Sequence, residues 1–266
     1  MTLAIEARQL VKTYTGRNGE VRAVQGVDLD VEAGEVFGFL GPNGAGKSTM
    51  VRMLTTLMTI TSGTALVAGV DVAASPDEAR RRIGVALQEA GLDARQTGRE
   101  LLVLQARLFG MDARSAAARA EELLRLVQLE DAADRRIKGY SGGMKRRLDL
   151  ASALVHEPDV LFLDEPTTGL DPASRITVWD EVRRINDRGT TVFLTTQYLE
   201  EADQLCDRLA IIDGGRIIRE GTPASLKAEL RERMGLEQEP TLDDVFLDAT
   251  GRTRERSAGE VQEVRG

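Results

Sequence analysis

A glycine-rich stretch, Gly41–Thr49, has the residue types and spacing best suited to chemistry in this chain. It matches the pattern G-x-x-x-x-G-K-[ST] directly after the apolar run Val36–Leu40. A loop poor in side chains lets backbone N–H groups approach phosphate oxygens, and a helix expected from near Lys47 to about Met58 would point its positive end at them. We therefore predict a triphosphate-binding loop with contacts from all of its residues, Gly41, Pro42, Asn43, Gly44, Ala45, Gly46, Lys47, Ser48 and Thr49. The alternative is a plain glycine-rich turn between a strand and a helix.

Two side chains of this loop and two later carboxylates have predicted catalytic or metal-binding roles. The Lys47 ammonium should reach the β and γ oxygens of the triphosphate, and the Ser48 hydroxyl should hold Mg²⁺. The run Val160–Glu165 is apolar until it ends in two carboxylates, as expected for a buried parallel strand whose end borders a ligand crevice. We expect Asp164 to bind Mg²⁺ with Ser48, and Glu165 to polarise a water in line with the γ-phosphate.

Two glutamines and a tyrosine are further candidates for the nucleotide site. Gln88 follows the apolar run Ile83–Leu87, and Gln197 stands just past the predicted strand Thr190–Thr195. Strand ends in an open α/β sheet border the ligand crevice, so both amides are expected near the nucleotide. Tyr14 is either a packing residue at a loop edge or a flat surface on which an adenine stacks.

Two polar stretches precede predicted helices. Ser141-Gly142-Gly143 comes before a helix expected at Met144–Val155, and taken alone it indicates only an N-cap. Gly169–Pro172, which contains Asp171, leads into a helix expected at Ala173–Arg188.

The other segments indicate a mixed α/β fold. Leu3–Leu10 and Val21–Val31 are typical of antiparallel strands around a turn at Thr15–Glu20. From about Gln96 the pattern is helical, beginning at a capping box formed by Thr97 and Glu100 and continuing to Leu129, and we interpret this insert of about residues 90–140 as a subdomain. A charged helical extension is expected at 231–250, and a frayed polar tail at 251–266.

Composition limits the classes of function. The chain has 266 residues, of which 42% are apolar and 29% charged, as in ordinary soluble proteins. Its net charge of −8 argues against a general nucleic-acid binder. Apolar runs break within about ten residues, short of the ~20 that a membrane span needs, so a membrane role would require a partner. We expect no secretory signal at the start of the sequence, because Glu6 and Arg8 interrupt the first apolar residues.

The chain has one cysteine and one histidine. Cys206 cannot form an internal disulfide, which agrees with a reducing cytoplasm, and we expect a buried structural thiol. His156 precedes Glu157-Pro158 at a helix end, which indicates a helix C-terminal charge or a surface residue.

Taken together, these motifs resemble those of the ATP-binding subunit of ATP-binding cassette (ABC) transporters. The likeness runs from about residue 3 to residue 230 and follows the family's order: Tyr14 as the adenine-stacking aromatic, Gly41–Thr49 as the Walker A loop, Gln88 as the Q-loop glutamine, Ser141–Gly143 as the core of the signature sequence, Leu161–Glu165 as the Walker B strand and Gly169–Asp171 as the D-loop. The resemblance implies an α/β P-loop NTPase fold with a RecA-like core sheet, an antiparallel β subdomain and an inserted α-helical subdomain. The ATP-binding domain would occupy residues 1–230.

Two positions depart from the family's pattern. Tyr140 and Met144 replace the outer residues of Leu-Ser-Gly-Gly-Gln but leave the Ser-Gly-Gly core intact. Gln197 occupies the position of the family's switch histidine. Its amide can donate a hydrogen bond to the γ-phosphate but carries no proton charge near neutral pH.

The resemblance also implies cofactors and partners. ATP and Mg²⁺ would bind at the interface of a head-to-tail homodimer or pseudo-dimer, with Ser48, Gln88 and Asp164 as metal ligands and Ser141–Gly143 contributed by the other protomer. A separate multi-span permease would dock on the helical insert and hold the chain at the cytoplasmic face of the membrane.

The segments Leu194–Asp203 and Thr241–Leu247 resemble daunorubicin-resistance-type subunits of drug exporters more specifically. Three other classes of protein remain alternatives. A phosphate-loop kinase would leave the Ser-Gly-Gly stretch and D-loop unexplained. A soluble cassette protein acting on ribosomes or DNA would call for tandem cassettes or a long heptad insertion. A GTPase is disfavoured because the Asn-Lys-x-Asp motif does not occur.

Overall fold

The structure, a computed structural model, describes residues 2–16, 19–88 and 91–251 of the chain. The tip of the turn predicted at Thr15–Glu20 and nearly all of the tail predicted at 251–266 lie outside the described residues.

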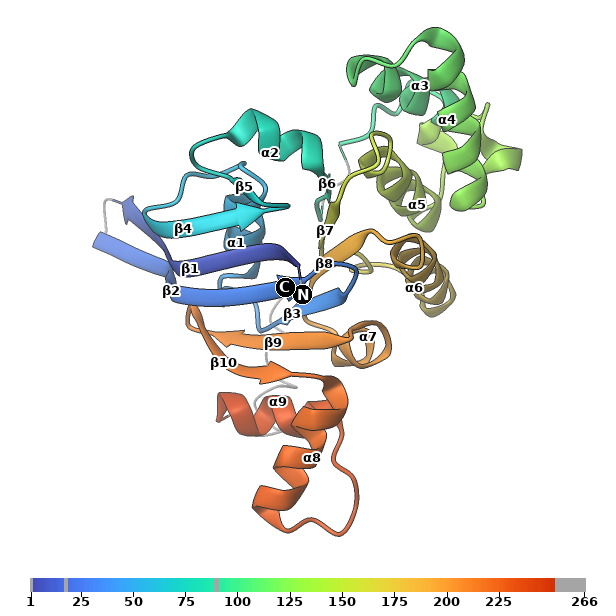
Figure 1. Cartoon of the computed structure of the whole chain (residues 1–266). Coiled ribbons are helices and arrows are strands. Elements are labelled where there is room, and N and C mark those ends of the chain that lie inside the picture. The colour runs from blue at the N-terminus through green and yellow to red at the C-terminus, as the bar shows by residue number, and fades with distance from the viewer. Residues whose placement is uncertain (1, 17–18, 89–90, 252–266) are drawn as a thin grey trace.

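A six-stranded sheet lies at the centre of the described part of the chain, in the order β10-β9-β3-β8-β7-β6 (Figure 1). Its parallel strands are β3 (Val36–Leu40), β6 (Ile83–Ala86), β7 (Val160–Asp164), β8 (Thr191–Thr196) and β9 (Arg208–Asp213). The hairpin strand β10 (Arg216–Gly221) is antiparallel to β9. Every residue of β3 and β7 is buried, because helices or strands cover both faces of the sheet, and this explains their continuous apolar runs.

A second sheet is antiparallel and has the order β2-β1-β4-β5. Its strands are β1 (Leu3–Gly16), β2 (Gly19–Glu32), β4 (Ser62–Val67) and β5 (Val70–Asp71). The β1–β2 hairpin is longer than the predicted strands, since pairing continues to Gly16 and Gly19. It extends away from the rest of the molecule in Figure 1.

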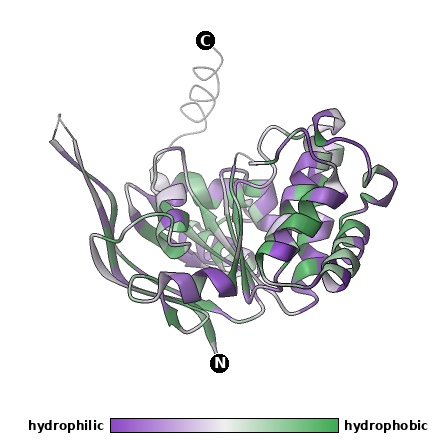
Figure 2. Ribbon diagram, turned by 90° about the horizontal axis from the view of Figure 1, so that it is seen from above, coloured by the Kyte–Doolittle hydropathy of each residue, from purple (hydrophilic) through white to green (hydrophobic). Residues whose placement is uncertain are grey.

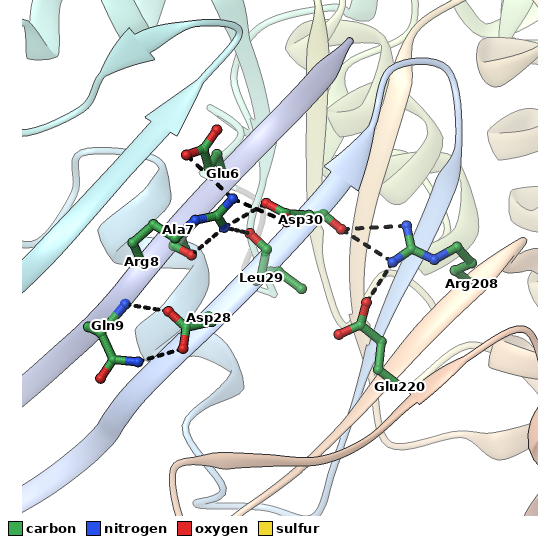
Figure 3. A network of polar contacts seen from close by, with 9 residues as sticks. All are labelled: Glu6, Ala7, Arg8, Gln9, Asp28, Leu29, Asp30, Arg208 and Glu220. Carbon is green, nitrogen blue, oxygen red and sulfur yellow. Dashed lines mark hydrogen bonds and ion pairs between the residues drawn. The ribbon is translucent and has the colours of Figure 1, made fainter. Parts of the chain in front are cut away.

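The guanidinium of Arg208 joins the two sheets (Figure 3). It lies 3.5 Å from the backbone carbonyl oxygen of Asp30 on β2 and donates to Glu220 on β10 at 2.5 Å. It also pairs with Glu35 at 2.9 Å. The carboxylate of Asp30 in turn accepts from Arg8 on β1, which extends the network across the antiparallel sheet.

Helices cover both faces of the central sheet. In order they are α1 (Lys47–Leu54), α2 (Pro76–Arg82), α3 (Gly98–Leu108), α4 (Ala113–Leu126), α5 (Gly142–Ala153), α6 (Pro172–Asn186), α7 (Leu199–Leu205), α8 (Pro223–Met234) and α9 (Leu242–Thr250), with short 3₁₀ helices at Glu130–Ala132 and Ile137–Gly139. Helices α3 and α4 stand beside α5 at one side of the molecule, as the predicted helical insert would (Figure 1). Among the described helices, none combines the length and the apolar character that crossing a bilayer requires.

The apolar core has two parts. Phe37, Phe39 and Phe193 face α1 and the antiparallel sheet, whereas Leu161 and Leu194 face the side covered by α4, α5 and α6. Figure 2 shows the apolar residues concentrated along the inner strands and on the inner faces of the helices. The predicted α/β fold, with its antiparallel sheet and inserted helices, is confirmed.

Two predicted helix ends are wrong, for a common reason. The first helix ends at Leu54, not near Met58, and the helix from Ala113 ends at Leu126, not Leu129. Thr56 and Gln128 take left-handed backbone conformations, with φ of 63° and 53°. A residue in this conformation turns the chain out of the helix. Threonine rarely adopts a left-handed conformation, so no residue type marks the helix end at Leu54.

The interpretation of His156 as a charged helix end or surface residue is also wrong. Its ring is partly buried, stacks on Phe109 with centroids 4.0 Å apart, and places Nε2 2.9 Å from the carbonyl oxygen of Ile83. Burial lowers the pKa of His156. Cys206 is buried as expected, and burial raises the pKa of its thiol.

Candidate nucleotide-binding site

The phosphate-binding loop connects β3 to α1 and depends on glycine at two positions. Gly46 has φ 109°, and a Cβ there would lie 2.5 Å from the carbonyl oxygen of Ala23. A Cβ on Gly41 would lie 2.4 Å from the carbonyl oxygen of Ile212. No larger residue fits either place without moving the backbone, which accounts for both glycines of the pattern.

Lys47 lies at the start of α1 and is 4% exposed. Its ammonium donates to the carbonyl oxygens of Gly41 at 2.8 Å and Pro42 at 3.2 Å, and it lies 3.4 Å from Glu165 Oε1. Burial lowers the pKa of Lys47, and the carboxylate of Glu165 opposes that shift. The ammonium therefore bridges the loop and the end of β7.

Ser48 and Asp164, the predicted metal ligands, lie together. Ser48 Oγ donates to Asp164 Oδ1 at 3.1 Å, and Thr195 Oγ1 donates to the same oxygen at 2.6 Å. Hydroxyl and carboxylate oxygens are the hard ligands that Mg²⁺ prefers, and it is commonly held by one or two carboxylates with substrate phosphates. The residues at this place fit the metal.

Glu165 follows β7 in a left-handed backbone conformation, with φ 48°. Its N–H lies 3.1 Å from both the carbonyl oxygen and Oγ1 of Thr195. Its Oε2 accepts from Gln88 Nε2 at 3.5 Å and from Thr168 Oγ1 at 3.2 Å. Such a conformation persists in a non-glycine residue only when its surroundings hold it, and it is commonest at functional sites.

The structure thus brings Lys47, Ser48, Gln88, Asp164 and Glu165 to one place at the carboxyl ends of β3, β6 and β7. Gln88 contacts Glu165, and its predicted role as a metal ligand stays a prediction.

Tyr14 lies near the end of β1, paired with Val21, and adjoins the phosphate-binding loop. Its hydroxyl lies 3.3 Å from Thr49 Oγ1 and donates to Met58 Sδ at 3.0 Å. The Lys12 ammonium lies 5.5 Å from the ring centroid. With the side chain 39% exposed, the ring is accessible beside the loop.

Ser141 and Asp171 are N-caps of α5 and α6. Ser141 Oγ accepts from the N–H of Met144 at 3.2 Å, and Asp171 accepts from the N–H and hydroxyl of Ser174 at 3.0 and 2.6 Å. The hydrogen bonds from Ser174 lower the pKa of Asp171. A Cβ on Gly143 would lie 2.9 Å from Ser174 Oγ, so the two caps lie close together.

Gln197 directly follows β8 and is partly buried. The N–H of the next residue, Tyr198, donates to Thr196 Oγ1 at 2.9 Å, and the Arg175 guanidinium lies 5.3 Å from the Tyr198 ring centroid. These contacts fix the backbone on the C-terminal side of Gln197. Gln197 lies two residues after Thr195, whose hydroxyl donates to Asp164.

Sequence reasoning missed two hydroxyls of this site, those of Thr168 and Thr195. Thr168 lies three residues after Glu165, where a turn brings its hydroxyl back to the carboxylate. Thr195 is opposite Asp164 in the ladder between β7 and β8. The one feature of the sequence that could have indicated Thr195 is a hydroxyl near the end of a buried strand.

Comparison with known proteins agrees with this geometry. The sequence model described as ABC transporter matches residues 24–168, which include the phosphate-binding loop, Gln88, Ser141–Gly143 and Glu165. The chain belongs to the ABC transporter family.

Individual ABC proteins match most of the chain. The daunorubicin/doxorubicin resistance ATP-binding protein DrrA of Streptomyces peucetius is 58% identical over 229 residues, covering 86% of this chain and 68% of that protein. Nod factor export ATP-binding protein I of Burkholderia lata is 48% identical over 210 residues, covering 79% of this chain and 69% of that protein. A solved dimeric ATP-binding cassette in a post-hydrolysis state, bound to ADP and Pi, has a TM-score of 0.75 at 27% identity, covering 82% of this chain and 98% of that one.

The predicted family is therefore confirmed. The chain is an ABC ATP-binding subunit and an ATPase, homologous to drug-resistance and Nod factor export subunits.

Proposed function

We propose that this ABC subunit hydrolyses MgATP to power the export of a drug, an antibiotic or another hydrophobic compound through a separate membrane permease. The observation that carries the proposal is the cluster of Lys47, Ser48, Asp164 and Glu165, in which all but the partly exposed Ser48 are buried, on one phosphate-binding loop and one strand end. The proposed direction of transport rests on the names of the relatives, which are resistance and export proteins.

The chain's own residues suggest how hydrolysis proceeds. Lys47 would exchange the carbonyl oxygens of Gly41 and Pro42 for the β and γ oxygens of ATP. Ser48 and Asp164 would hold Mg²⁺, which neutralises charge on the phosphate oxygens when bound. Glu165, with Oε2 oriented by Gln88 and Thr168, would polarise the attacking water.

We propose that the active form is a head-to-tail dimer. Ser141, the N-cap of α5, and the first two residues of that helix, Gly142 and Gly143, form an accessible helix N-terminus that would bind the γ-phosphate held by the second copy. Gln197 would donate a hydrogen bond to the same phosphate from its own copy, and Tyr14 would stack on the adenine. The dimeric cassette bound to ADP and Pi supports this arrangement by its similarity.

We further propose that the permease docks on the helical insert. Three apolar side chains are exposed on the second half of α3 and its C-cap: Leu104, Leu108 and Phe109. Exposed apolar groups so close together favour contact with another protein.

We also propose that the ATP-binding domain occupies residues 1–230, with a helical extension at 231–250. Bound to the permease, the chain would lie at the cytoplasmic face of the membrane.

Affinity purification of the full chain from native membranes, followed by ATPase assays with and without the recovered partner, tests the proposal. We expect a multi-span membrane protein whose presence changes the rate of hydrolysis, and drug efflux that is lost with Glu165→Gln. Recovery of ribosomes or DNA, with hydrolysis independent of any membrane partner, would overturn the transport role.

A further inference from the structure

Arg146 is a buried arginine in the second turn of α5, the helix that begins after Ser141. It is 6% exposed. Its ion-pair partner is Asp149, one turn later on the same helix, with Nη1 and Oδ2 3.1 Å apart. A buried guanidinium needs several acceptors, because each unsatisfied N–H costs free energy.

Three backbone carbonyl oxygens supply those acceptors, and all belong to other segments. Nε donates to Pro166 at 2.8 Å, Nη1 donates to Leu87 at 2.5 Å, and Nη2 lies 3.4 Å from the carbonyl oxygen of Asp164. One side chain of α5 therefore holds the main chain after β6 and the main chain after β7.

Each of these carbonyl groups adjoins a residue of the nucleotide site. Leu87 immediately precedes Gln88, and Asp164 and Pro166 stand on either side of Glu165. Glu165 has the left-handed conformation described above, which its surroundings must hold in place. The guanidinium binds the carbonyl oxygens on both sides of it.

We propose that Arg146 is a positioning residue for ATP hydrolysis. Its guanidinium fixes the backbone of Gln88 and Glu165 relative to each other and couples both to α5, whose N-terminus carries Ser141–Gly143. A shift of α5 therefore moves the predicted base and the Q-loop glutamine together. The inference rests on the proposed role of Glu165 as the base.

Arginine suits this position because its planar fork directs N–H groups to several acceptors at fixed angles. Lysine keeps the charge but offers a single ammonium on a flexible chain, and one nitrogen cannot reach carbonyl oxygens that lie around the whole guanidinium. The replacement Arg146→Lys therefore separates positioning from charge.

The experiment measures steady-state ATP hydrolysis by the full chain and its Arg146→Lys variant. We expect kcat to fall roughly tenfold or more while KM for ATP changes less than about threefold, because phosphate binding by Lys47 remains and the base is misplaced. The matched control is Arg147→Lys. Arg147 adjoins Arg146 and also donates to two carbonyl oxygens, those of Val127 and Gln128, but these lie away from the site. Equal losses in the two variants would overturn the proposal.

A double variant distinguishes action through Glu165 from a general structural effect. In the Glu165→Gln background, Arg146→Lys should lower kcat by less than about twofold, since the group it positions is already gone. If Arg146→Lys instead lowers kcat by the same factor in the Glu165→Gln background as in the wild type, the positioning role of Arg146 is overturned, whereas the proposed role of Glu165 as the base still stands. Glu165→Gln with the wild-type rate would overturn both that role and the proposed base.

Arg146→Gln keeps the test decisive if Arg146→Lys does not fold. The glutamine amide is planar and retains two N–H donors. We therefore expect Arg146→Gln to have a kcat between those of the wild type and Arg146→Lys, and a thermal midpoint of unfolding close to that of the wild type. Failure of both variants to fold would make Arg146 a structural residue only and would overturn the proposal.

Discussion

The ammonium of Lys47 lies 3.4 Å from the carboxylate of Glu165, and both side chains are buried. The pair joins the phosphate-binding loop to the end of β7. The cation that would bind phosphate therefore lies in direct contact with the proposed base. Burying either charge alone would cost free energy, and the opposite charge of its partner offsets part of that cost.

We predict that Lys47→Ala abolishes hydrolysis. Removing the ammonium removes the phosphate ligand and leaves the Glu165 carboxylate buried without its cation, so we expect kcat/KM to fall by at least roughly 100-fold. Titration with a fluorescent ATP analogue and a phosphate-release assay would measure binding and rate. Lys227→Ala is the control, because Lys227 pairs with Asp203 on α7 away from the site. Similar losses in both variants would contradict the role of Lys47.

We predict that Glu165→Gln binds ATP but hydrolyses it at least roughly 100-fold more slowly, because the amide cannot accept a proton from water. ATP then persists at the interface, so the variant should form a stable dimer in size-exclusion chromatography with MgATP. Glu200→Gln, at an exposed position of α7, should remain at the wild-type rate and association state. Dimers that appear equally with both variants would speak against ATP retention as the cause.

Local patterns predicted much of this molecule. The apolar runs at β3 and β7 identified buried parallel strands, and the capping box at Thr97 and Glu100 identified the start of α3. These signals depend on neighbouring residues only, so the sequence contains them in full.

Contacts between distant segments could not be predicted in the same way. Thr195 reaches Asp164 because β7 and β8 pair in one particular register, and a shift of one residue would point it to the other face. From the sequence, Arg146 is simply a charged residue on a predicted helix. The carbonyl groups to which it donates lie in two other segments of the chain. His156 was misplaced because its ring packs on Phe109, 47 positions earlier in the sequence.

Gly46→Ala should destabilise the protein more than Gly44→Ala. Both glycines have positive φ, 109° and 78°, so both substitutions strain the backbone. A Cβ on Gly44 has nothing within 4 Å, whereas one on Gly46 would meet the carbonyl oxygen of Ala23 at 2.5 Å. We expect an additional loss of roughly 1–3 kcal/mol for Gly46→Ala in urea unfolding. Equal destabilisation would mean that the loop moves away from Ala23 at little cost.

Gln197 should contribute no titration to the rate of hydrolysis between about pH 6 and 8, because its amide does not ionise there. Gln197→His should alter the rate and add a pH-dependent component in that range, since an imidazole beside phosphate changes charge near neutrality. Rates measured across the range for both forms test this. Gln204→His, at an exposed position of α7, is the control. An unchanged rate and pH profile in Gln197→His would place the side chain away from the γ-phosphate.

The stability of the protein should also depend on the ionisation of Asp149. Burial raises the pKa of Asp149 to about 6, although Arg146 opposes the shift. The same carboxyl in the unfolded chain has a pKa of about 3.9, so between about pH 4 and 6 the folded protein holds a proton that the unfolded chain has lost. The stability that this group contributes is therefore present below about pH 4 and lost as the pH rises through about 6.

Asp149→Asn removes that titration. We expect the free energy of unfolding of the wild type, minus that of the variant, to fall by up to about 3 kcal/mol between about pH 4 and 7, measured by urea unfolding. Asp134→Asn provides the contrast, because the hydrogen bond from Arg99 lowers the pKa of Asp134, and stability from such a group is lost only as the pH falls. A difference that rises with pH for Asp149→Asn would show that Arg146 stabilises the carboxylate more than burial disfavours it.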